Sequence, residues 1–204
     1  KNNLFETGSF PNSIILNGKL HIIGGQKSNK HLIWNGKLKK FEIIHTFTEF
    51  KGISGAILCH LKSQNVLALI GGTTYKPFKI LNTIYVFFIE QFRWIKYEYS
   101  LPFGMTNMSH IVTPNEQYIL LIAPIIDSSS SSSPTRTDRM YVLNTGNMEC
   151  KQSEMTLPSS NNNDNKPMPC HAILSNYNTN EYLFITGYIR IYAQNLRVYK
   201  LIIY

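Results

Sequence analysis

The stretch Leu67-Ala68-Leu69-Ile70-Gly71-Gly72 decides how the chain is organised. Four apolar residues run directly into a pair of glycines, and an earlier copy of this arrangement ends at Gly24-Gly25. Two weaker copies end at Ala123-Pro124 and at Gly187. Similarity that recurs about every 50 residues is typical of repeat architectures, in which each repeat is one supersecondary unit. The sequence therefore predicts four copies of one small structure.

Each copy reads as four β-strands. Short apolar runs rich in branched and aromatic residues are bounded by turn residues such as Asn17-Gly18, and no window keeps a helical period for three turns. Four strands in series, each turning back on the last, form an antiparallel meander. We predict an all-β chain, a β-propeller of four-stranded blades. The expected blades span residues 9–52, 53–106, 107–166 and 167–204.

The charge is positive and uneven. The net charge is +8; residues 1–100 hold 13 Lys and Arg against 5 acidic residues, and residues 101–204 hold 7 against 7. Fifteen of the basic residues are Lys and five are Arg. Because base and phosphate recognition favours the fork of Arg, this balance argues against nucleic acid and for lysines that solubilise strand edges.

Cysteine usage and hydropathy bear on location. The three cysteines, Cys59, Cys150 and Cys170, contain no Cys-x-x-Cys pair, so neither a disulfide framework nor a zinc site is predicted. A reducing compartment fits this pattern. No apolar run reaches the length of a membrane span. We therefore expect a cytoplasmic protein without a membrane-spanning segment.

The repeat resembles the kelch family. The resemblance lies in the strand that ends in Gly-Gly, in an aromatic before aliphatics at Tyr85-Val86 and Tyr141-Val142, and in Trp94 of strand four. It covers about four blades, of which two carry the glycine pair. Kelch propellers usually close with more than four blades, so the resemblance implies a larger or incomplete ring. It also implies a module that binds other proteins.

No catalytic, metal or cofactor site is predicted from the residues. His110 and His171 occupy equivalent repeat positions, where we expect structural hydrogen bonding. Resemblance to kelch-fold copper oxidases offers the alternative of a metal pair, and a sugar-acid isomerase on the same fold is a further alternative. The twelve carboxylates are scattered, and no nucleophile elbow or phosphate loop occurs.

The long loops between strands two and three, together with the links between blades, are the expected binding surface. The meander places segments 73–82, 124–138 and 158–169 on one face, and loops on a rigid frame commonly carry binding. The serine run 128–133 and the asparagine-rich stretch 159–166 read as neutral expansions. The candidate anchors are Tyr75, Lys76 and Phe78. We predict a non-catalytic protein-interaction module; a basic surface for an anionic partner is the remaining alternative.

Overall fold

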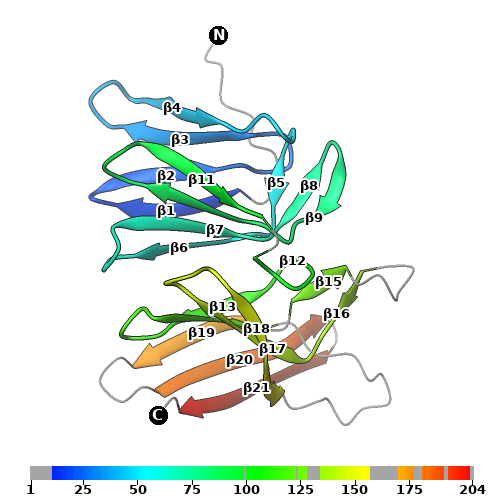
Figure 1. Cartoon of the computed structure of the whole chain (residues 1–204). Helices are drawn as coiled ribbons and strands as arrows, with labels where there is room; N and C mark the ends of the chain where they lie inside the picture. The colour runs from blue at the N-terminus through cyan, green and yellow to red at the C-terminus, as the bar shows by residue number, and fades with distance from the viewer. Residues whose placement is uncertain are drawn as a thin grey trace. The chain divides into compact units, whose positions relative to one another are not determined.

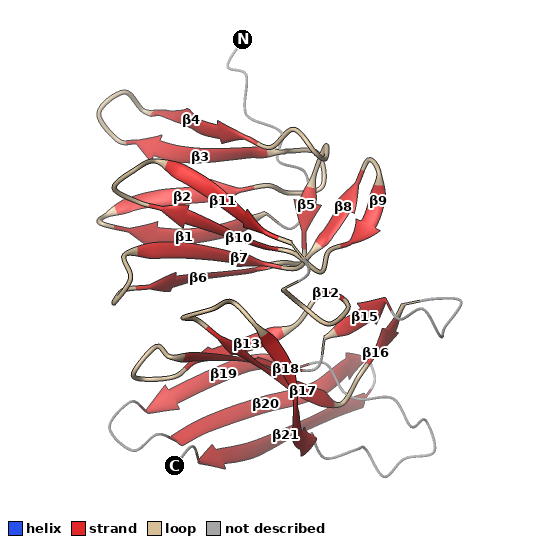
Figure 2. Ribbon diagram, viewed as in Figure 1, coloured by secondary structure: helices blue, strands red, loops and turns tan. Residues whose placement is uncertain are grey.

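The computed structural model describes residues 11–98, 100–122, 124–127, 134–156, 170–176, 181–190 and 193–202, with side chains as far as residue 155. Every regular element in these ranges is a β-strand, and Figure 2 shows strands joined by loops. The predicted all-β class is therefore confirmed. The chain forms two compact units, Lys1–Thr106 and Asn107–Tyr204, which are described separately below. Ala123, the serine run and the asparagine-rich stretch lie outside the described residues.

The first unit contains two four-stranded antiparallel meanders (Figure 1). The first sheet consists of β1 (Asn12–Leu16), β2 (Lys19–Ile23), β3 (Lys30–Asn35) and β4 (Lys40–Thr46). The second sheet consists of β6 (Ile57–Leu61), β7 (Val66–Ile70), β10 (Ile84–Phe88) and β11 (Arg93–Tyr97). In both sheets the spatial order follows the chain order, as the sequence predicts.

A third, smaller sheet in this unit was not predicted. It consists of β5 (Ile53–Ser54), β8 (Thr73–Tyr75) and β9 (Phe78–Ile80), in the order β5-β8-β9. The prediction that residues 73–82 form an irregular loop is wrong, because these residues begin with a hairpin whose turn is Lys76-Pro77. Threonine and aromatic residues on either side of a proline turn favour this hairpin. A short strand, β12 (Gly104–Thr106), ends the unit.

The second unit begins with a third four-stranded meander. The third sheet consists of β13 (Ser109–Val112), β14 (Tyr118–Ile122), β17 (Arg139–Asn144) and β18 (Cys150–Thr156). Between β14 and β17, the short strands β15 (Ile125–Asp127) and β16 (Thr135–Arg136) pair with each other. In both the second and the third sheet, the connection between strands two and three therefore contains two short strands that pair with each other.

The last sheet differs from its prediction. It has three strands, β19 (Cys170–Asn176), β20 (Glu181–Arg190) and β21 (Ala193–Ile202). The prediction that a strand ends at Gly187 is wrong: β20 continues through this residue, which pairs with Leu196 of β21. A single glycine is tolerated inside a strand, and without a second glycine or a proline nothing here forces a turn.

The first three sheets repeat the same register. The penultimate residue of strand two pairs with the same position of strand three in each sheet: Ile22 with Leu32, Leu69 with Tyr85, and Leu121 with Tyr141. Two residues further along strand three, Trp34, Phe87 and Leu143 pair with Phe41, Trp94 and Cys150 of strand four. One face of each sheet is thus built from the same positions, which is what a structural repeat requires.

Each glycine pair joins strand two to the segment that follows the sheet. Gly24 and Gly71 have φ of 71° and 62°, in the left-handed region that favours glycine. The next residue then bonds to a later segment: Gly25 N–H donates to the Ile53 carbonyl at 2.7 Å, and Gly72 N–H donates to the Met105 carbonyl at 2.7 Å. The two contacts are equivalent, because each glycine pair is hydrogen bonded to the segment that follows strand four of its own sheet.

The two large sheets of the first unit pack face to face. Leu16 and Ile23 of the first sheet share a buried cluster with Leu67, Leu69 and Phe87 of the second. The linker residues Phe47 and Phe50 stack at 5.2 Å between ring centroids and belong to the same cluster. Burying a side chain of this size stabilises a fold by about 1.5–3 kcal/mol. Ile53 of β5 belongs to the same cluster, so this core also anchors one strand of the small sheet β5-β8-β9.

Candidate functional site

The hairpin of β8 and β9 is fixed from its inner side. The hydroxyl of Tyr75 lies 2.9 Å from Ser54 Oγ and accepts a hydrogen bond from Gln26 Nε2 at 3.1 Å. The hydroxyl of Thr74 lies 2.6 Å from the carbonyl of Pro77 and so closes the turn. Tyr75 is half-buried. Its hydroxyl therefore fixes the hairpin to Ser54 and Gln26, and Tyr75 positions the hairpin.

The tip of the hairpin exposes an aromatic ring among lysines. Phe78 has 69% of its surface exposed, and Lys76 and Lys79 beside it are also exposed. Lys51 joins them from the linker between the two sheets, because its N–H donates to the Lys76 carbonyl at 3.2 Å. We call Lys51, Lys76, Phe78 and Lys79 the hairpin tip. The structure thus brings Tyr75, Lys76 and Phe78 into one short element, with Tyr75 half-buried and the other two exposed.

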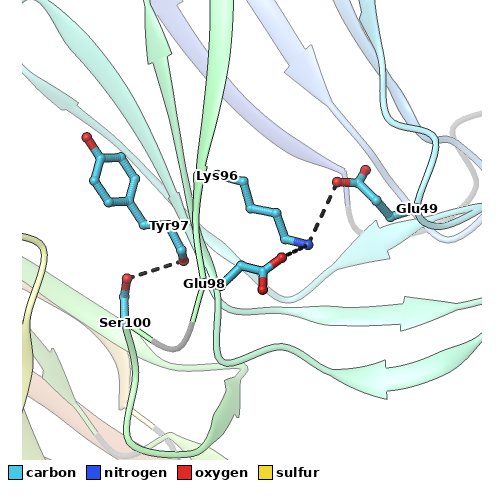
Figure 3. A network of polar contacts seen from close by, with 5 residues as sticks. All are labelled: Glu49, Lys96, Tyr97, Glu98 and Ser100. Atoms are coloured by element: carbon cyan, nitrogen blue, oxygen red, sulfur yellow. Dashed lines mark hydrogen bonds and ion pairs between the residues drawn. The ribbon is translucent and has the colours of Figure 1, made fainter.

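Lys96 forms a charged network with two carboxylates (Figure 3). The Lys96 ammonium lies 2.9 Å from Glu98 Oε1 and 3.9 Å from Glu49 Oε1. The hydrogen bond from Lys96, then its charge, and then the charge of Lys79 lower the pKa of Glu98. Both nearby carboxylates therefore face Lys96. In the described part of the chain, no carboxylate lies within 4.0 Å of the ammonium of Lys51, Lys76 or Lys79.

Two members of the hairpin tip were missed by the sequence reasoning. Lys79 follows Phe78 directly in β9, and the alternation of a strand turns its side chain to the opposite face of the hairpin, so Phe78 gave no signal for it. Lys51 lies 25 residues earlier in the chain than Lys76, and only the pairing of β5 with β8 brings it there. No local pattern in the sequence marks that contact.

A second polar cluster is buried between the two sheets of the first unit. Trp94 Nε1–H donates to His31 Nδ1 at 3.3 Å, and His31 Nε2 lies 2.9 Å from His21 Nδ1. Since an indole can only donate, Nδ1 of His31 is the acceptor and its proton sits on Nε2, pointing at His21. His31 is fully buried against the edge of Phe87. The chain Trp94, His31, His21 is therefore satisfied only while His31 is neutral.

Burial lowers the pKa of His31 to about 3, with further lowering by the charges of His21 and His45. Of the histidines singled out in the sequence, His110 has its pKa lowered by burial, and the side chain of His171 lies outside the described residues. Within the ranges described with side chains, no three His, Cys, Asp or Glu residues gather as a metal site would require. Hydrogen bonds are observed for His21 and His31, and ring contacts for His21, His31 and His45.

A scan of protein-family models and a search of curated proteins each find no match to this chain. Across the described residues, no helix has the length and apolarity needed to cross a membrane.

Proposed function

We propose that this chain is a kelch-like propeller module that binds another protein through the hairpin tip. The observation that carries the proposal is Phe78, an aromatic ring 69% exposed on an element whose inner side is fixed by hydrogen bonds. Aromatic side chains dominate the energy of protein interfaces when they fill a pocket on the partner. A braced hairpin also loses little conformational entropy on binding, which favours affinity.

The repeated register supports the propeller part of the proposal. Leu69, Tyr85 and Phe87 of the second sheet pack against the first sheet. The equivalent positions of the first sheet, Ile22, Leu32 and Trp34, form its opposite face. On this face Leu32 is buried, whereas Trp34 is 36% exposed and the neighbouring Ile43 is 49% exposed. An apolar face built like one that packs on a sheet is suited to receive another sheet, as successive propeller blades do.

Alanine at position 78 should strongly weaken partner capture without changing the fold. Phe78 contributes no buried surface to the core, so we expect a Phe78→Ala chain to keep its thermal midpoint within about 2 °C. An interface anchor of this kind is worth about 2 kcal/mol or more, so at least tenfold less partner should be retained in an affinity pull-down. The matched control is Phe92→Ala, because Phe92 is also exposed, at 61%, on the β10–β11 turn. Equal capture by both variants would contradict the proposal.

A further inference from the structure

The hairpin tip carries positive charge that the neighbouring residues do not balance. Four lysines, Lys51, Lys76, Lys79 and Lys96, lie in this region with two carboxylates, Glu49 and Glu98. Lys96 is the one placed between both carboxylates. The other three lysines are exposed, and within the described residues none has a carboxylate within 4.0 Å of its ammonium, so they are available to an external anion.

We propose that the hairpin tip recognises an acidic segment of the partner protein, with carboxylates on the three lysines and an apolar side chain against Phe78. This inference rests on the proposed function and adds the chemistry of the partner. Lysine reaches a carboxylate as a point charge on a flexible stem, so several acidic spacings can satisfy three lysines. The aromatic ring fixes the register, and the charges steer the encounter.

The size and composition of the patch favour a peptide over other polyanions. Nucleic acid binding uses extended basic tracks, commonly with arginine and several stacking aromatics, whereas the hairpin tip has one ring and no arginine. A membrane surface gains about 1 kcal/mol per lysine near anionic lipid, which leaves three lysines and one ring below stable anchoring. An acidic peptide segment matches the few charges and the single apolar contact.

The test is a selection from a display library of random 12-residue peptides on the full chain, with removal of every clone that also binds the Phe78→Ala chain. We expect the remaining clones to be enriched in Asp and Glu beside an apolar residue. Phe78-dependent clones without that enrichment would overturn the acidic-segment inference and leave the proposed function standing. A library that yields no Phe78-dependent clone would remove both.

Charge substitution tests the same inference on the selected peptides. The triple variant Lys51→Gln, Lys76→Gln, Lys79→Gln should bind a fluorescein-labelled selected peptide about tenfold more weakly by anisotropy in dilute salt. The matched control changes three exposed lysines around the exposed Leu38, namely Lys37→Gln, Lys39→Gln, Lys40→Gln. Equal loss in both variants would show that net charge alone acts and would overturn the inference. So would Phe78-dependent capture of phosphatidylserine vesicles that the peptide does not compete away.

Discussion

Replacing Gly24 by alanine is expected to destabilise the first unit by about 3–5 kcal/mol. At φ of 71° a β-carbon is already strained, and an added Cβ would lie 2.6 Å from the Ile53 carbonyl oxygen and would overlap the Ile53 Cγ2 methyl. The Ile53 backbone cannot retreat, since it is hydrogen bonded to Gly25 in both directions. The measurement is urea unfolding followed by tryptophan fluorescence, because both tryptophans, Trp34 and Trp94, belong to the first unit.

The control for this substitution is Gly18→Ala. Gly18 has the same φ of 71°, but an added Cβ would meet no atom within 4 Å. It should therefore cost only the conformational strain, about 1 kcal/mol. The difference between the two variants isolates the close approach of the glycine pair to the next repeat. Equal destabilisation by Gly24→Ala and Gly18→Ala would show that the close contact between Gly24 and Ile53 does not contribute to the stability of the first unit.

Acid is expected to weaken the first unit through His31. An unfolded His31 takes up a proton near pH 6.5, whereas the folded residue resists protonation down to a pKa of about 3. The contribution of neutral His31 to the free energy of unfolding is therefore fully present well above pH 6.5. It is lost as the pH falls from 6.5 toward 3. The slope approaches about 1.4 kcal/mol per pH unit below pH 6.5, so the loss between pH 6.5 and pH 4.5 is about 2 kcal/mol.

The variant that tests this pH dependence is His31→Gln. Glutamine can accept from the Trp94 indole and donate to His21, but it does not titrate. We expect it to be less stable than the natural chain at pH 7 and to have a shallower fall in unfolding free energy between pH 6.5 and pH 4.5. Parallel curves for the two proteins would rule out His31 as the source, and would direct attention to His21 and His45, whose pKa values are also lowered by burial.

Much of the sheet structure can be predicted from short stretches of sequence. Asn17-Gly18 and the apolar run ending at Gly71 mark a turn and a strand end by themselves, and the structure has both. Gly187 shows where this reasoning fails, because one glycine does not end a strand that is paired along its length. The hairpin at residues 73–80 was missed because each of its strands has only three residues, too few to show alternation.

The site was predictable only in part. Phe78 and Lys76 follow from a long connection on a rigid frame, which is a general property of propeller-like meanders. The position of Lys51 and the pairing of His31 with Trp94, 63 residues away, depend on tertiary contacts. Sequence spacing carries no signal for either contact. The roles of Tyr75 as a brace and of His31 as a neutral buried base could therefore come only from the structure.

Photo-crosslinking from the hairpin tip tests the central claim most directly. p-Benzoylphenylalanine is placed at position 78 in one chain and at position 92 in another, so that the same reactive group is presented from two exposed turns. If the hairpin tip binds a partner protein, irradiation with cell extract should give a discrete adduct from position 78 that is absent from position 92. No adduct from position 78, or the same adducts from both positions, would contradict binding at this surface.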